Sequence, residues 1–162
     1  MKPMSNNEGF VLRLENFLPY RLVVAASLVS QATARTYATK YGIGIAEWRV
    51  IAQLGEFGTM TAKQIGARSH MHKTKVSRAV ATLTKKKMLA RRANRDDKRE
   101  AFLSLSPLGL EIYESIAPAA QALSQRMFGE VSGEDRAAFE RVLDTVTARA
   151  AALADTAAEL PD

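Results

Sequence analysis

Cations and hydroxyl groups share one face of a helix predicted at residues 72–87. On a helical wheel, Thr74 and Arg78 point directly away from an apolar stripe formed by Val76, Val80 and Leu83. Such side chains donate hydrogen bonds to phosphate oxygens and to base edges, so this face predicts contact with nucleic acid. The candidate contact residues on this helix are Lys73, Thr74, Lys75, Ser77 and Arg78.

The charge of the whole chain is concentrated around this helix. Residues 61–100 hold 13 of the 23 Lys and Arg residues and 3 of the 17 Asp and Glu residues. This segment therefore carries +10, and the remainder of the 162-residue chain carries −4. A solvated surface usually mixes the two signs, so the segregation favours a polyanion-binding segment, and nucleic acid is the commonest such partner.

A second basic cluster lies in the polar segment 94–99, between two short runs that read as strands, 88–93 and 100–105. We expect a hairpin whose tip carries Arg95, Lys98 and Arg99 as DNA contacts, with Arg99 in a minor groove or on a phosphate. Asp97 would repel phosphate. We therefore expect it to orient Arg99 or Arg78 through a charge-assisted hydrogen bond, which leaves open whether Arg78 reads bases.

Three predicted helices must position these groups. Residues 45–56 have a helical apolar face, and Thr61 with Gln64 has the spacing of a capping box that starts a short helix over 61–68. The helix over 72–87 follows. Thr61 and Lys63 are expected to hold the DNA backbone at the start of the short supporting helix.

Longer helices are predicted on both sides of this region. The first runs from Pro19 to about 40, after a loose arm over 1–16 that has a short helical piece near 10–17. Ser106 and Pro107 start another helix that reaches about 128, which Pro118 should kink or divide. The last helix starts at Ser132 and runs to about 153, and the tail frays after 155.

This order of elements predicts a mostly α fold with a small β-hairpin, namely a winged helix-turn-helix flanked by dimerisation helices. We divide the chain into an N-terminal arm and dimerisation helix (1–44), a DNA-binding lobe (45–106) and C-terminal dimerisation helices (107–162). The terminal helices carry more apolar surface than so small a lobe could cover, which favours a homodimer.

Several of these residues together resemble the MarR-type transcriptional regulators. The resemblance rests on Trp48, the stretch 74–78, the run Asp97-Lys98-Arg99 and the helix start 106–109, and it covers about residues 18–150. It implies a homodimer on a palindromic double-stranded operator, regulated by a small molecule. Many relatives have Gly where this chain has Lys87, so we expect backbone strain at Lys87 or a different helix end.

The resemblance also implies an effector site between the dimerisation helices and the DNA-binding lobe. Aromatic rings could stack on the effector and cations could meet its carboxylate. For Trp48 the alternative of a core residue is the better one. We expect an aromatic acid or an aromatic acyl-CoA as the effector. The candidate effector-binding residues are Tyr20, Arg21, Tyr37, Trp48, Arg49 and His70.

Other function classes find little support in the sequence. Cysteine is absent, which excludes disulfides and thiol chemistry, and no nucleophile–base pair or phosphate-binding glycine loop stands out, so no enzyme and no cofactor is expected. His70 and His72 are two residues apart and lack a nearby carboxylate, so no metal site is expected. No apolar run could span a membrane and the start lacks a secretory signal, which favours the cytoplasm. The open alternatives are a non-specific architectural DNA-binding protein and, with less support, a protein-interaction module.

Overall fold

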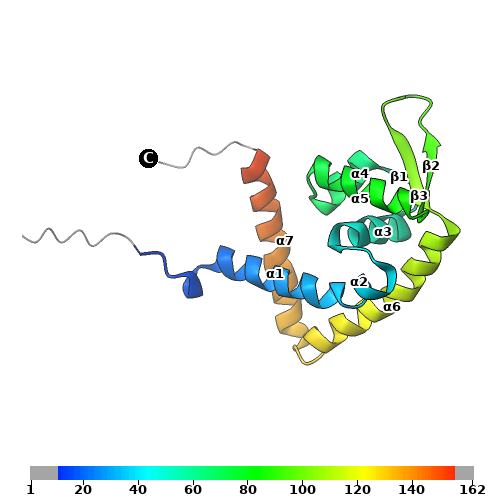
Figure 1. Cartoon of the computed structure of the whole chain (residues 1–162). Helices are drawn as coiled ribbons and strands as arrows, with labels where there is room; N and C mark the ends of the chain where they lie inside the picture. Colours follow the sequence, from blue (N-terminus) through cyan, green and yellow to red (C-terminus); the bar gives the residue numbers. More distant parts are fainter. Residues whose placement is uncertain (1–10, 156–162) are drawn as a thin grey trace, which may run out of the picture. The chain divides into compact units, whose positions relative to one another are not determined.

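The computed structural model describes residues 11–155 of the chain, which forms two compact units, Met1–Ala120 and Gln121–Asp162. The first unit contains η1 (Leu14–Asn16), α1 (Leu18–Ala34), α2 (Ala38–Tyr41), α3 (Ile45–Phe57), β1 (Met60–Thr61), α4 (Ala62–Ser69), α5 (Lys73–Lys85), β2 (Leu89–Ala93), β3 (Ala101–Leu105) and most of α6 (Pro107–Phe128). The second contains the end of α6 and α7 (Gly133–Asp155) (Figure 1). The predicted fold class is confirmed, whereas the three-part domain division stays a prediction.

Local signals explain where α4 and α5 begin. The backbone N–H of Gln64 donates to Thr61 Oγ1 at 3.2 Å, and the backbone N–H of Thr61 donates to Gln64 Oε1 at 2.8 Å. This is the predicted capping box. His72 caps α5, since its Nδ1 accepts from the backbone N–H of Thr74 at 3.3 Å. The helices predicted over 61–68 and 72–87 are both confirmed, although α5 ends at Lys85 rather than Lys87.

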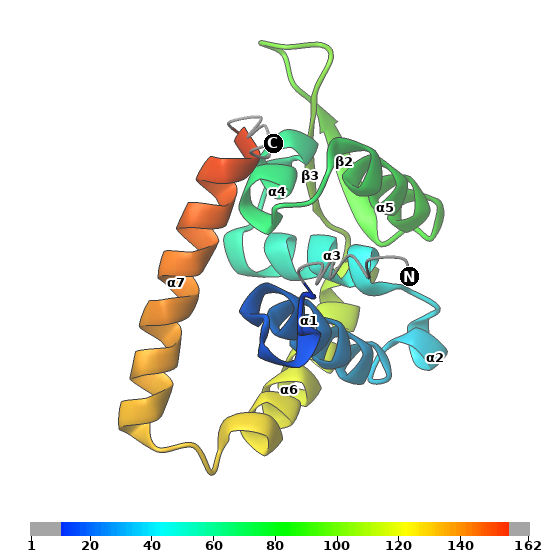
Figure 2. The same cartoon turned by 90° about the vertical axis from the view of Figure 1, so that its left-hand side faces the viewer.

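The sheet is antiparallel and has the order β1-β3-β2. The predicted hairpin is confirmed as β2 and β3, whose register pairs Leu89 with Leu105 and Ala93 with Ala101. The sequence did not indicate β1, which pairs with β3 so that Met60 lies opposite Leu103. The β2–β3 loop projects beyond α4 and α5 as a wing (Figure 2).

The buried side of α5 packs into the core of the first unit, which holds the helix in place. Val76 and Leu83 of α5 are buried together with Ile65 of α4, Ile51 of α3 and Leu103 of β3. The predicted apolar stripe of α5 therefore faces inward, as the 3.6-residue period requires. Ile112 and Ile116 of α6 belong to the same cluster.

The predicted first helix is wrong at its C-terminal end. The helix stops at Ala34, and a turn leads to the separate short helix α2. The cause is Tyr37, which is only 1% exposed and lies in the core of the first unit. The turn is held by the Thr36 hydroxyl, which donates to the Thr33 carbonyl at 2.7 Å.

The end of α5 shows the expected strain at Lys87, whose φ is +59°. The N–H of Met88 donates to the Leu83 carbonyl at 2.9 Å, which closes the helix in the way that glycine usually allows. The Ser106 hydroxyl donates to the Lys87 carbonyl at 2.7 Å and accepts from the N–H of Gly109 at 3.0 Å. A Cβ at Gly109 would collide with the Met88 carbonyl oxygen, so glycine is needed where α6 passes this turn.

The long C-terminal helices begin where the sequence predicted. Pro107 opens α6, which runs through Pro118 without being divided there. Before α7, Ser132 Oγ accepts from the N–H of Asp135 at 3.1 Å. Most of the predicted arm (1–10) and the tail after 155 lie outside the described residues.

Candidate nucleic-acid interface

The exposed face of α5 carries the five contact residues that the sequence predicted on this helix. Val76, Ala79, Val80 and Leu83 are buried. The exposed residues are Lys73, Thr74, Lys75, Ser77 and Arg78. Because the buried side of the helix is fixed by the core, the opposite side presents cations and hydroxyls on a rigid support.

The two candidates at the start of α4 differ in their surroundings. Lys63 is exposed. Thr61 is only 5% exposed and its hydroxyl accepts the capping hydrogen bond from Gln64. A buried, committed hydroxyl does not suit a direct contact with DNA, so the structure places Thr61 as the residue that positions α4 and leaves Lys63 as the group able to meet a ligand.

Asp97 and Arg99 form a two-point ion pair at the tip of the wing. Arg99 Nε donates to Asp97 Oδ1 at 3.0 Å, and the second hydrogen bond runs from Arg99 Nη2 to Asp97 Oδ2 at 3.2 Å. The backbone N–H of Arg99 also donates to Oδ1 at 3.0 Å. These hydrogen bonds lower the pKa of Asp97 and raise that of Arg99. Within residues 11–155, the ion-pair partner of Asp97 is Arg99 and not Arg78.

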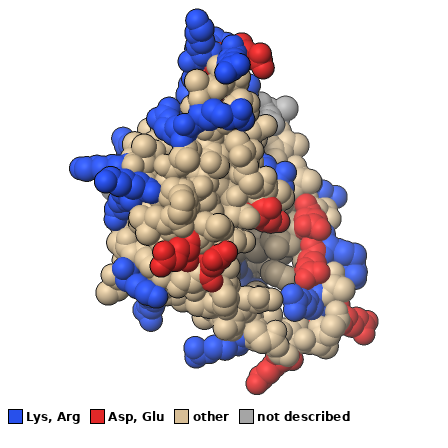
Figure 3. All heavy atoms as spheres, turned by 90° about the vertical axis from the view of Figure 1, so that its right-hand side faces the viewer, with Lys and Arg blue, Asp and Glu red and all other residues tan. Residues whose placement is uncertain are grey.

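The ion pair leaves most of the guanidinium free for another partner. The side chain of Arg99 is 90% exposed, and only two of its five N–H donors are used by Asp97. Arg95 and Lys98 are exposed beside it. Lys and Arg side chains crowd over the projecting wing, as Figure 3 shows. The wing tip therefore offers one arginine oriented by Asp97 and two further exposed cations.

A hollow of about 790 Å³, which we call the wing groove, separates α4 and α5 from the wing. Four cations line it: Lys63, Lys73, Arg91 and Arg99. Two acids, Asp97 and Glu100, also line it. The sequence reasoning missed Arg91. The signal that could have found Arg91 is the alternation of side chains along β2, which puts Arg91 on the same face of the strand as the buried Leu89. Alternation alone does not show that this face continues into a groove.

The candidate effector residues do not all come together. Tyr37 and Trp48 do come together, with ring centroids 5.6 Å apart. Tyr113 of α6, which was not a candidate, also stacks near Trp48, with ring centroids 6.3 Å apart. Burial raises the pKa of Tyr37, and the nearby charge of Arg49 partly offsets this. Tyr37 is part of the core and Trp48 packs against it, so both rings already have apolar neighbours.

The remaining effector candidates lie elsewhere. Tyr20 and Arg21 are exposed near the start of α1, and His70 ends α4 with φ at +50°. The described residues contain no group of three or more His, Asp or Glu side chains able to hold a metal ion. No helix in the described part of the chain is long and apolar enough to cross a membrane.

Comparison with known proteins supports the fold and shows a family resemblance over part of the chain. Residues 41–100 match the sequence model of the MarR family. Over these residues the chain is similar to MarR-family proteins. The matched region includes the capping box, the helix α5 and the Asp97–Arg99 pair.

One relative of this MarR-type chain is the uncharacterized HTH-type transcriptional regulator YdcH of Bacillus subtilis strain 168. The two are 36% identical over 70 residues, which is 43% of this chain and 48% of YdcH. The chain spans less than two thirds of the length of the curated relatives that it matches.

Two solved structures share the MarR-type fold. Sco3205 of Streptomyces coelicolor, a MarR family regulator solved in complex with DNA, has a TM-score of 0.77 at 23% identity and covers 96% of this chain and 98% of its own. BpsR of Bordetella bronchiseptica, whose DNA binding is regulated by 6-hydroxynicotinic acid, has a TM-score of 0.72 at 20% identity. The match covers 80% of this chain and 98% of BpsR. At these identities the likeness establishes the fold.

Proposed function

We propose that this MarR-type chain is a transcriptional regulator that binds a specific double-stranded DNA sequence as a homodimer. The observation that carries the proposal is the pairing of two cationic parts on one rigid core, namely the exposed face of α5 and the wing tip held by Asp97 and Arg99. A helix fits the major groove and a narrow arginine-tipped wing fits a minor groove.

Each part of this surface has a separate task in the proposal. Thr74, Ser77 and Arg78 read base edges from α5, because their hydroxyl and guanidinium groups match the donors and acceptors displayed there. Arg99 enters the minor groove. Phosphate contacts come from Lys63, Lys73, Lys75, Arg95 and Lys98, all of them exposed. The chain binds and releases DNA without a catalytic step or a cofactor.

Exposed apolar residues on the terminal helices support the dimer. In α1, Leu18 is 65% exposed, Val23 64% and Leu28 60%, and in α7 Val142 is 61% exposed. Large apolar side chains exposed together on a helix support a protein interface there. We assign residues 1–44 and 107–162 to dimerisation and 45–106 to DNA binding. Two-fold symmetry then predicts a palindromic operator with the recognition helices about 34 Å apart.

We further propose that the chain acts as a cytoplasmic repressor that a small aromatic acid or aromatic acyl-CoA releases from DNA. Arg49, an exposed cation, directly follows Trp48 in the sequence. The ring of Tyr37 lies beside that of Trp48 in space. Binding there would act on α3, which packs on α5 through the common core. The regulation of BpsR by 6-hydroxynicotinic acid is a precedent within the same fold.

Selection from a library of random duplexes tests the proposed function. The purified chain should enrich a palindrome and bind it at least about a thousandfold more tightly than mixed-sequence duplex. Light scattering should give twice the chain mass of 17.7 kDa. A preference of only a few fold would support the architectural alternative instead, and a monomer would contradict the dimer.

Thermal-shift measurements with aromatic acids and their CoA esters test the effector. A true effector should raise the melting temperature and also weaken binding to the selected palindrome. A compound that stabilises the protein but leaves DNA binding unchanged would not be the effector proposed here.

A further inference from the structure

The wing groove lies where DNA itself must pass if the proposed function is correct. A helix in a major groove and a wing in the adjacent minor groove are separated by one sugar–phosphate strand. In this chain the space between α5 and the wing is the wing groove, lined on one side by Lys73 and Ser77 and on the other by Arg91 and Arg99. The groove is therefore the path of the backbone between the two DNA grooves.

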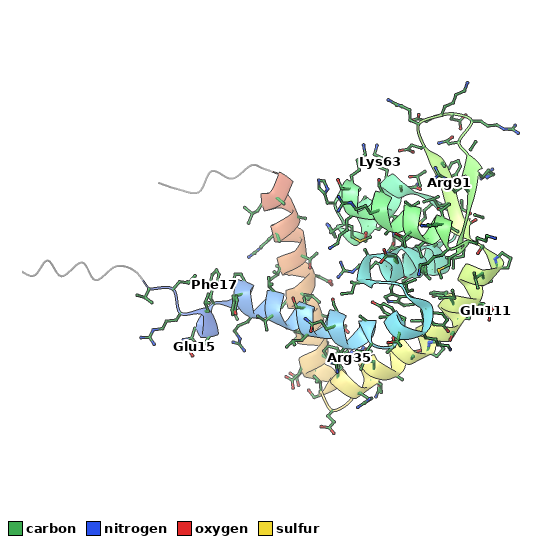
Figure 4. All side chains as sticks on the ribbon, viewed as in Figure 1. Glu15, Phe17, Arg35, Lys63, Arg91 and Glu111 are labelled. Carbon is green, nitrogen blue, oxygen red and sulfur yellow. The ribbon has the colours of Figure 1, made fainter. Side chains whose placement is uncertain are left out.

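We propose that Arg91 binds a phosphate of the strand that runs through the wing groove, with Lys63 of α4 as the second cation at the same passage. This inference rests on the proposed function and adds the route of the backbone and a contact residue on β2. Figure 4 labels both side chains, Lys63 on α4 and Arg91 on β2, and both line the wing groove.

The neighbouring residue Arg92 shows why position 91 is special. Arg91 pairs in register with Leu103, whose side chain is buried, and Arg92 pairs with Phe102. Since successive side chains of a strand point to opposite faces, Arg91 faces the groove and Arg92 faces away from it. The Arg92 guanidinium lies 5.1 Å from the centre of the Phe102 ring, and both residues line a different hollow with Asn94 and Arg95.

The charges in the wing groove favour an anion. Asp97 is held by Arg99 in the two-point ion pair, so its charge is already matched. Glu100 is the remaining acid against Lys63, Lys73 and Arg91. Lys63 lowers the pKa of Asp97, which places the α4 cation within electrostatic reach of the wing.

Small side chains let a backbone strand come close to the floor of the groove. Gly66, Ala67, Ser77 and Ala81 line it from α4 and α5. Long side chains at these positions would fill the passage. Among the cations of the lining, a flexible arginine can follow the position of a phosphate oxygen.

Arg91→Ala and Arg92→Ala form a matched pair for the test, because both remove one exposed arginine from the same strand. Binding to the palindrome recovered by selection is measured by fluorescence anisotropy over a range of salt concentrations. We expect Arg91→Ala to weaken binding about five- to tenfold near 0.1 M salt and to lower the slope of log K against log salt by about one. Arg92→Ala should leave the slope unchanged.

Equal slopes for wild type and Arg91→Ala would overturn the inference, as would equal losses in the two variants. Circular dichroism of both variants checks that each is folded. If the wild type itself selects no duplex and binds none, the proposed function fails, and that result is distinct from a wild type that binds DNA without using Arg91.

A chemically modified duplex locates the contact on the DNA. Neutral methylphosphonate linkages are placed one at a time in the strand between the two grooves. At one position the substitution should weaken the wild type about as much as Arg91→Ala does, and it should weaken Arg91→Ala no further. If each linkage weakens the variant as much as the wild type, Arg91 does not bind this strand and the inference is wrong.

Discussion

Asp97 receives both the Nε–H and one Nη–H of Arg99, at 3.0 and 3.2 Å, although only Lys98 separates them in the chain. The carboxylate thus fixes the direction of the guanidinium at the wing tip. An arginine that is held before it meets DNA loses less side-chain freedom on binding than a free one.

Arg99→Ala should weaken binding to the selected palindrome about ten- to hundredfold, because a charge-assisted contact in the minor groove is lost. The dimer should stay intact, since Arg99 belongs to the wing. Anisotropy titration and light scattering measure the two properties.

Arg92→Ala is the matched control for this change. Arg92 is also an exposed arginine of the wing, but it lies on β2 and faces away from the wing groove. Its replacement should leave DNA affinity within about twofold. Unchanged affinity in Arg99→Ala would show that the wing tip does not contact DNA.

The Asp97–Arg99 pair should also have a defined pH dependence. The pKa of Asp97 is lowered by its hydrogen bonds with Arg99. The stabilisation from the ion pair is therefore fully present at pH values above the ordinary carboxyl pKa of about 4, and it is lost only as the pH falls through the lowered pKa of Asp97. The NMR signal of the Arg99 Nε–H should therefore stay constant from about pH 8 to pH 5 and move only in stronger acid.

Asp97→Asn supplies the control for the titration. The amide cannot ionise, so the acid transition of the Arg99 signal should disappear. A signal that instead titrates near pH 6 would mean that a different group controls the guanidinium.

Glycine at position 109 should contribute strongly to stability. A Cβ there would meet the Met88 carbonyl oxygen, so Gly109→Ala should lower the free energy of unfolding by about 2–4 kcal/mol. Urea unfolding followed by circular dichroism measures the change. Gly133→Ala is the comparison, since nothing lies within 4 Å of a Cβ at Gly133, and it should cost less than about 0.5 kcal/mol. Equal stabilities for the two variants would contradict the close approach of α6 to the Met88 turn.

Several parts of this fold could be predicted because they depend on neighbours in sequence. The capping box of Thr61 and Gln64 needs only four residues, and the stripe of Val76, Val80 and Leu83 follows from the helical period. The strain at Lys87 was one of two outcomes expected from the family resemblance, since many relatives have Gly at this position.

Contacts between distant residues explain what the sequence did not reveal. The inward position of Tyr37 ends α1 early, and helical periodicity over 19–40 carries no sign of it. The strand β1 has only two residues and exists because β3 lies beside it. Arg91 joins the candidate site only because β2 packs next to α5, so its role needed the tertiary structure.

Lys87→Gly should stabilise the chain, which is the opposite of the usual effect of glycine. The φ of Lys87 is +59°, where a side chain costs energy that glycine avoids, so we expect a gain of about 1 kcal/mol. Lys85→Gly, at the last residue of α5, should instead lose about 0.5–1 kcal/mol. Thermal and urea unfolding distinguish the two, and a loss in both would mean that Lys87 makes a contact worth more than the strain.

Hydroxyl-radical footprinting of the wild-type chain on its selected palindrome tests most directly whether α5 and the wing grip adjacent grooves of one duplex. We predict two symmetric sets of protected sugars whose centres lie about 10 base pairs apart, each with a flanking protection that Arg99→Ala removes. Uniform protection along any duplex, or the same footprint in Arg99→Ala as in the wild type, would contradict the account.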